Sequence, residues 1–227
     1  MNLRHLPLEG DVSIAFESRP IWDAVRIAER FGPIPMNRIC TDPPPGLATE
    51  EDVVRFDDHE DRLYELVDGI LVGKTMGAYE SMLAVEFARL LKNFVKPRKL
   101  GAILGEAGLL RLAPGLVRIP DVAFLSMEKF PGGRFPREKI LTAAPDLAVE
   151  VLCESNTKKE MAEKLNDYFA AGARLVWYVD ADTRQVEVFT SPTNSRIVRE
   201  DELLDGGDVL PGFELNLREL FAELPPE

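Results

Sequence analysis

A carboxylate inside an apolar strand and a lysine on the apolar face of a helix are the residues here that could do chemistry. Glu150 stands within LAVEVL, residues 147–152, and such an apolar run is typical of a strand covered on both faces. An unpaired Glu150 carboxylate would destabilise that strand by several kcal/mol, so we expect a cation beside it. In the next segment, Lys164 shares a helical face with Met161 and Leu165. The two residues together predict a functional site.

A second acid that the sequence places in a buried strand is Asp121, in RIPDVAF. Asp121 and Glu150 on neighbouring strands would repel one another unless a divalent cation or a shared proton reconciled them. With Lys164 nearby, the set matches metal-assisted hydrolysis, in which carboxylate oxygens hold Mg²⁺ and the lysine orients or polarises a water. The alternative is structural: Asp121 caps a turn after Pro120, Glu150 pairs with Lys164, and no reaction is catalysed.

Two further acids could complete the shell of such a metal. Glu65 lies in the alternating segment YELVDG, and Glu80 lies near the start of the predicted helix AYESML. The commoner fate of each is a solvated surface carboxylate or a charge at a helix start. Glu80 lies where the start of a helix could point it at the sheet, and the sequence leaves open which of the two acids completes the site.

The elements that must position these residues follow the order helix, several strands, helix, strands. RLYELVDGILVGK alternates around Asp68-Gly69 and predicts a β-hairpin. A helix is predicted over AYESMLAVEFARLLKNFVK, and strands over AILGEAGLLRLAPG and LVRIPDVAFLS. This order predicts an α/β or α+β fold with a mixed β-sheet flanked by helices.

The chain divides by composition into an arm and a main domain. Residues 1–50 form an N-terminal arm with a short helix over residues 21–31 and the proline-rich connector DPPPG, which can be neither helix nor central strand. Residues 51–224 form the main domain, and they hold every acid considered above.

The composition restricts location and partners. The start of the chain lacks the features of a secretory signal, and no apolar run approaches the roughly 20 residues that span a membrane. Two cysteines give neither a disulfide framework nor a metal spacing. We therefore expect a cytoplasmic protein without membrane contact.

The formal charge of −12 opposes the basic footprint of nucleic-acid binders, so contact with DNA must come from local basic patches. The alternative for these patches is a solvated helix end and a solvated loop. The candidate residues are Lys92, Lys96, Arg98 and Lys99 in one patch, and Arg134, Arg137 and Lys139 in the other.

The motifs YELVDG, RIPDVAF, PDLAVEV and K-x-x-x-Y-F-x-A-G with VWYVD resemble the Uma2 family, which is similar to the PD-(D/E)xK nuclease superfamily. The resemblance covers about residues 50–224. The superfamily pattern is an acid after proline and then a strand with acid-x-lysine, which Asp121 and Glu150 fit. Leu152 stands where the lysine belongs. In the family, the following helix supplies that lysine, and Lys164 stands at that place.

This resemblance implies a restriction-endonuclease-like core and a Mg²⁺-dependent endonuclease acting on DNA, with Mn²⁺ as a substitute. The backbone carbonyl of Val151 would help Asp121 and Glu150 to bind the metal, and Lys164 would position the attacking water. The residues that it implies for catalysis are Asp121, Glu150, Lys164, Glu80 and Glu65, the last two as alternatives at the metal.

Two questions stay open from the sequence. A homodimer is expected, because duplex cleavage uses two active sites and the arm could be exchanged between subunits. A non-catalytic module of nuclease fold that binds nucleic acid or a protein partner is the alternative function, and the net charge favours it. A third hypothesis is a metal-dependent hydrolase of another phosphoester.

Overall fold

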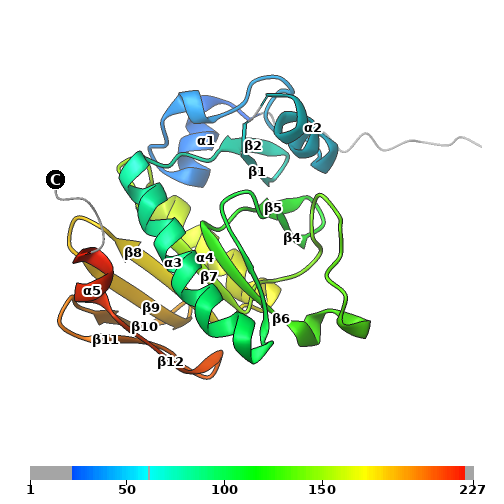
Figure 1. Ribbon diagram of the computed structural model, residues 1–227. Helices are drawn as coiled ribbons and strands as arrows, with labels where there is room; N and C mark the ends of the chain where they lie inside the picture. The colour runs from blue at the N-terminus through cyan, green and yellow to red at the C-terminus, as the bar shows by residue number, and fades with distance from the viewer. Residues whose placement is uncertain (1–21, 61, 223–227) are drawn as a thin grey trace, which may run out of the picture.

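The computed structural model describes residues 22–60 and 62–222, with helices on both faces of a larger mixed sheet (Figure 1). The sheet has the strand order β10-β9-β8-β7-β6-β3. Among these six strands only β7 and β8 run parallel, and helix α4 (Lys158–Ala171) makes the crossover that parallel neighbours need. The predicted mixed sheet flanked by helices is confirmed. Its strands are β3 (Gly101–Leu104), β6 (Val122–Ser126), β7 (Leu147–Val151), β8 (Leu175–Asp180), β9 (Gln185–Ser191) and β10 (Asn194–Val198).

A smaller antiparallel sheet, in the order β2-β1-β5-β4, carries the predicted hairpin. Asp68 and Gly69 both have positive φ, 52° and 72°, as a two-residue type I′ turn requires. The hairpin around this pair is therefore confirmed. The strands are β1 (Tyr64–Val67), β2 (Ile70–Gly73), β4 (Leu110–Ala113) and β5 (Leu116–Arg118). Only three residues separate β5 from β6, so the two sheets meet at this point of the chain.

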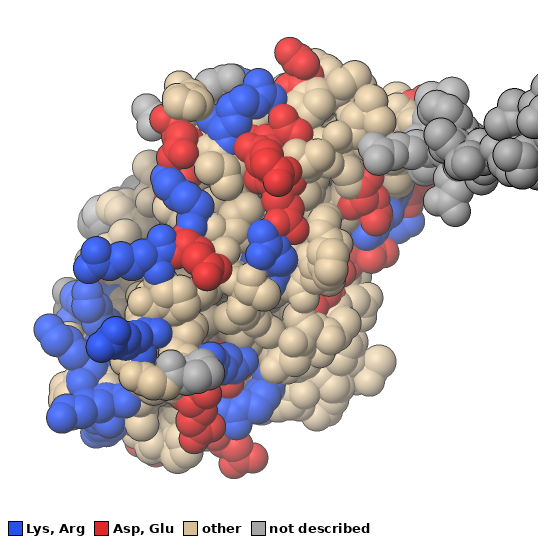
Figure 2. All heavy atoms as spheres, turned by 90° about the vertical axis from the view of Figure 1, so that its right-hand side faces the viewer, with Lys and Arg blue, Asp and Glu red and all other residues tan. Residues whose placement is uncertain are grey.

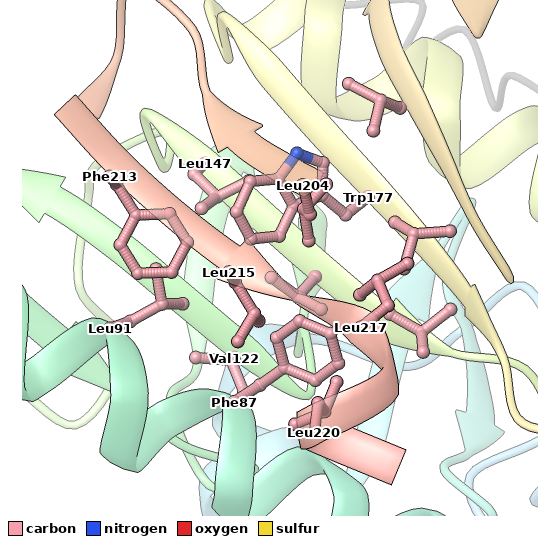
Figure 3. Close-up of a cluster of buried hydrophobic side chains, with 14 of the residues drawn as sticks. Phe87, Leu91, Val122, Leu147, Trp177, Leu204, Phe213, Leu215, Leu217 and Leu220 are labelled. Carbon is pink, nitrogen blue, oxygen red and sulfur yellow. The ribbon is translucent and has the colours of Figure 1, made fainter. Parts of the chain in front are cut away.

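One face of the larger sheet is covered by helix α3 (Ala78–Arg98), the hairpin β11–β12 and helix α5. Figure 3 shows this core, in which Phe87 and Leu91 of α3 pack against Trp177 of β8 and Phe213 of β12. The Trp177 ring stacks on Phe213 at a centroid distance of 6.0 Å. The hairpin consists of β11 (Leu203–Gly206) and β12 (Leu210–Asn216), and α5 (Leu217–Ala222) follows it.

The opposite face of the sheet is covered by helix α4 (Lys158–Ala171). Thr157 and Glu160 form a reciprocal capping box at its start, and Gly172 ends it in the left-handed conformation. Its buried stripe of Met161, Leu165 and Tyr168 packs on β7, β8 and β9. The capping residues and the stripe thus fix the position of Lys164, which lies between them.

The described part of the N-terminal arm packs on the main domain, mainly over the smaller sheet and the start of α4 (Figure 1). Ile27 and Phe31 of the first helix join Val67 and Ile70 in one apolar cluster. The predicted start of this helix at Ile21 lies outside the described residues. The remaining elements are α1 (Ala24–Phe31), α2 (Glu50–Glu60) and the 3₁₀ turns η1 (Met36–Arg38), η2 (Met127–Lys129) and η3 (Pro131–Gly133). No helix within residues 22–60 and 62–222 is long and apolar enough to cross a lipid bilayer.

Candidate active site

The alternation of side chains along β7 places an acid on the α4 side of the sheet. Leu147 and Val149 face the α3 core, whereas Ala148 packs with α4. Glu150, two residues after Ala148, points to that same side, and its residue is only 4% exposed. Strand periodicity therefore accounts for a carboxylate in the interior next to helix α4.

Asp121 joins Glu150 from the neighbouring strand. Val122 pairs with Val149 in the antiparallel register of β6 and β7, so Asp121 comes opposite Glu150. Asp121 Oδ2 accepts a hydrogen bond of 2.6 Å from the amide of Val151. The two acids that the sequence placed on adjacent strands thus lie side by side, at the point where the two sheets meet.

Lys164 reaches the acids from α4. Its Nζ lies 3.0 Å from Glu150 Oε1 and 3.1 Å from Glu65 Oε1, and the residue is 4% exposed. One turn later, the hydroxyl of Tyr168 donates to the same oxygen of Glu150. Lys164 therefore bridges an acid of each sheet, while Tyr168 fixes the orientation of Glu150.

Glu65 is a buried member of this cluster, not a surface carboxylate. Arg118 Nη1 lies 2.8 Å from Glu65 Oε2, and the amide of Ile119 donates to Glu65 Oε1 at 3.0 Å. Arg118 in turn pairs with Asp167 of α4 at 2.6 Å. Both oxygens of Glu65 are thus engaged by positive groups.

Glu80, the other acid considered for the shell of the metal, lies away from the cluster that Glu65 joins. Glu80 does not line the cavity that holds the other acids, and it forms no hydrogen bond or ion pair with the part of the chain that the structure describes. Its carboxylate lies against Gly77, the N-cap of α3. The positive end of the helix dipole stabilises a carboxylate there, so the helix start holds Glu80 locally instead of pointing it at the sheet.

A lysine that the sequence analysis missed contacts Asp121. Lys74 follows β2 directly, and its Nζ lies 2.7 Å from Asp121 Oδ1 and donates to the carbonyl of Ile119. Its side chain is 6% exposed. The signal was present in the hairpin: Glu65 pairs with Val72, and Lys74 is two residues beyond Val72 on the same face.

Arg38 of the N-terminal arm also reaches the site. It forms a two-point ion pair with Glu160, with distances of 2.6 and 3.0 Å. Its other donors bind the carbonyls of Gly73, at 3.0 Å, and Ser155, at 2.9 Å. Arg38 thus ties the arm to the end of β2 and to the start of α4, and nothing in the local sequence marks it as buried.

Burial and neighbouring charges separate the two glutamates of the cluster. Burial alone would raise the pKa of Glu65, but Lys164 and then Arg118 lower it to about 2. Burial raises the pKa of Glu150, and the nearby Asp121 carboxylate adds to the rise against the effect of Lys164. Although burial opposes it, Glu150 and Glu65 raise the pKa of Lys164. Lys164 is therefore a cation at neutral pH, and Glu65 an anion.

The cluster surrounds a narrow polar cavity with about 10 Å³ of free space, roughly enough for one water molecule. Of the four carboxylate oxygens of Asp121 and Glu150, only Glu150 Oε2 has neither a hydrogen bond nor an ion pair with a described residue. The cavity is lined by Arg38, Glu65, Lys74, Thr75, Asp121, Glu150, Val151, Asn156 and Lys164.

The donors of this cavity suit a hard divalent cation that arrives with its own ligands. Within residues 22–60 and 62–222, no group of three or more His, Cys, Asp or Glu residues is arranged to hold a metal ion. Mg²⁺, however, is commonly held by one or two carboxylates together with waters and substrate phosphates. The carboxylates of Asp121 and Glu150, with the backbone of Val151 beside them, fit that mode and not a preformed cage.

Both predicted basic patches lie on the surface, and Figure 2 shows lysines and arginines gathered at one edge of the molecule. The patch at the end of α3 is exposed, and Arg98 stacks on the ring of Phe94. In the second patch, Lys139 pairs with Asp58 and, at 3.6 Å, with Asp57. The α3 patch is thus the more available of the two for an anionic partner.

Comparison with known proteins agrees with this architecture. The model of the Uma2 family, described as "Putative restriction endonuclease", matches residues 50–218. The fold is similar to a solved structure described as a "putative nuclease belonging to DUF820 from Anabaena variabilis ATCC 29413". The TM-score is 0.63 at 18% identity, and the match covers 71% of this chain and 91% of that chain. No curated protein matches the chain. At this identity the solved structure shows a common fold alone.

Proposed function

Since this chain belongs to the Uma2 family, we propose that it is a nuclease that hydrolyses phosphodiester bonds of DNA with the help of Mg²⁺. The observation that carries the proposal is the meeting of Asp121, Glu150 and Lys164 in one buried cavity. Two acids and a fixed ammonium group are the residue types that metal-assisted phosphodiester hydrolysis needs. The family description, "Putative restriction endonuclease", supports the same reaction class.

Asp121 and Glu150 would hold the metal, with Mn²⁺ as a substitute and the backbone of Val151 as a further donor. When bound, a divalent ion would supply a Lewis acid for the phosphoryl group and would make water a better nucleophile. The residues of the chain supply position and charge. The amide of Val151 fixes Asp121, and the hydroxyl of Tyr168 fixes Glu150.

Lys164 acts as a donor in this proposal. Its raised pKa keeps the ammonium protonated, so it can hold the attacking water and stabilise the negative charge that develops on the phosphate. Glu65 is itself held as an anion by Arg118, and it keeps Lys164 aimed between the two acids. Glu65 is thus a positioning residue that acts through Lys164.

The test is cleavage of supercoiled plasmid and of single-stranded DNA with Mg²⁺ or Mn²⁺. Lys164→Met should lose cleavage by about 100-fold or more, as removal of one transition-state donor commonly does. Lys158→Met is the matched control, because Lys158 lies on the exposed face of the same helix. No cleavage by the wild type, or equal cleavage by Lys164→Met, would overturn the proposal.

A non-catalytic binding module is the second candidate, and the closed cavity favours it. The acids of the site are already paired with lysines and an arginine, and the whole chain carries a charge of −12. Such a module would bind a partner without needing a divalent ion. Calorimetric titration with Mn²⁺ separates the two, because binding that Asp121→Asn abolishes would count against the module.

We infer further that two copies act together, because cutting both strands of a duplex calls for two active sites. DNA would approach through the exposed basic patch at the end of α3. Light scattering with and without duplex DNA measures the number of copies directly. A monomer in both conditions would remove this part of the proposal.

A further inference from the structure

Lys74 stands where the proposed metal site would need a cation. Its ammonium lies 2.7 Å from Asp121 Oδ1 and also donates to the carbonyl of Ile119. The other Asp121 oxygen already accepts the amide of Val151. A positive charge from the chain itself therefore occupies the direction from which a divalent ion would reach Asp121.

The charge of the cluster is nearly balanced without any added ion. Its ion pairs join the carboxylates of Glu65, Asp121, Glu150 and Asp167 to the side chains of Lys74, Lys164 and Arg118. Four carboxylates thus face three cations among the described residues of the cluster. A divalent ion added to this set would leave excess positive charge in a poorly solvated place, which is unfavourable unless one cation moves away or an anion enters too.

Among the three cations, Lys74 forms the fewest ion pairs. Lys164 pairs with Glu150 and Glu65, and Arg118 pairs with Glu65 and Asp167, whereas Lys74 pairs with a single carboxylate. Lys74 also lies just beyond the end of β2, where its backbone amide still donates to the carbonyl of Leu63 at 2.9 Å, so only its side chain would have to move.

The space next to Lys74 can take its side chain. A second cavity of about 360 Å³ adjoins the first and is also lined by Lys74 and Thr75. Glu106 lines this second cavity, and it forms no ion pair with the residues that the structure describes. An ammonium that leaves Asp121 would therefore find room in a cavity that Glu106 lines together with Arg38 and Arg62.

We propose that Lys74 is a built-in counter-cation that occupies Asp121 in the metal-free protein and must swing into the neighbouring cavity when a divalent ion binds. This inference rests on the proposed function, because it concerns the same metal site. It makes Lys74 a competitor of the metal. It also favours entry of the ion together with a phosphate, whose negative charge offsets the added positive charge.

Binding of Mn²⁺ without DNA tests the inference, measured by electron paramagnetic resonance of free Mn²⁺ and by the metal-induced shift in Tm. Lys74→Met should bind Mn²⁺ at least about tenfold more tightly than the wild type, because the competing charge is gone. Lys129→Met is the matched control. Lys129 lies away from the site but likewise contacts one carboxylate, Asp146 at 3.4 Å, and one carbonyl, Ala144 at 2.7 Å. The Lys129→Met variant should bind Mn²⁺ with the same affinity as the wild type.

Lys74→Gln serves as a second variant in case Lys74→Met does not fold, and circular dichroism checks both. Equal or weaker Mn²⁺ binding by folded Lys74 variants, with binding still abolished by Asp121→Asn, would overturn this inference alone. Mn²⁺ binding that Asp121→Asn leaves unchanged would instead remove the proposed metal site, and with it the proposed function.

Discussion

The two faces of the larger sheet carry opposite chemistry although the same strands build them. On the α3 side, Phe87, Trp177 and Phe213 form a buried apolar layer. On the α4 side, the apolar layer gives way to Glu150 and Lys164 where the smaller sheet begins. The alternation along β7 allows this division, because each second residue serves the other face. The α3 face holds the fold together, which leaves the α4 face to carry charges at a cost in stability.

The largest effect should come from the apolar face. Phe87→Ala is expected to lower the free energy of unfolding by about 4 kcal/mol, the usual cost of deleting a buried aromatic ring. Urea unfolding measures the change. Val85→Ala on the same helix is the control and should change little, because Val85 is 66% exposed. Equal losses of unfolding free energy in the two variants would contradict the conclusion that the buried α3 face stabilises the fold.

The charged face should respond next. Arg118→Met leaves Glu65 and Asp167 without their guanidinium group, so we expect a loss of about 3 kcal/mol in the free energy of unfolding. Arg184→Met removes an exposed pair with Glu200 and should cost less than about 1 kcal/mol. A stabilised Arg118→Met protein would mean that packing outweighs pairing on this face.

The charged face should also make stability depend on pH. The pKa of Glu65 in the folded protein, about 2, lies below its ordinary value of 4.5, so the unfolded chain binds the proton more readily. The contribution of Glu65 is therefore fully present above about pH 4.5 and is lost as the pH falls towards 2, by on the order of 3 kcal/mol.

Urea unfolding of the wild type and of Glu65→Gln between pH 6 and pH 2 checks this dependence. The difference in stability between the two proteins should shrink as the pH falls, because the wild-type carboxylate takes up its proton. A difference that stays constant over this range would contradict the assignment.

The smallest effect belongs to Glu80. Glu80→Gln should lower the free energy of unfolding by less than about 1 kcal/mol, through the lost interaction with the helix dipole, and should leave Mn²⁺ binding unchanged. Thermal unfolding and a Mn²⁺ titration of the same sample test both. A weaker affinity of Glu80→Gln for Mn²⁺ would indicate that Glu80 contributes to the metal site.

Local periodicity was enough to predict part of the cluster. Glu150 and Asp121 interrupt apolar strands, and Lys164 interrupts an apolar helix face, so each is marked by its own neighbours in the sequence. Their meeting also follows from pairing of adjacent strands. The mixed sheet and the Asp68-Gly69 hairpin were predictable for the same reason, since both depend on short-range patterns.

The residues that escaped prediction depend on contacts between distant segments. Lys74 follows a strand, and the hairpin pattern places it on the face of Glu65, but only the structure brings Asp121 to it from the other sheet. Glu65 is a candidate from the sequence, but its burial becomes visible only when the structure brings Arg118 and Lys164 to it. No periodicity within one segment encodes such long-range pairing.

The bonds of Arg38 have a consequence for where this protein can be cut. The family match begins at residue 50, yet Arg38 supplies the guanidinium that faces buried Glu160 and two backbone carbonyls. A chain shortened to the matched region would leave that carboxylate without its partner beside the candidate active site. The region matched by the family is thus smaller than the part of the chain that completes this ion pair, and activity should be measured on the full chain.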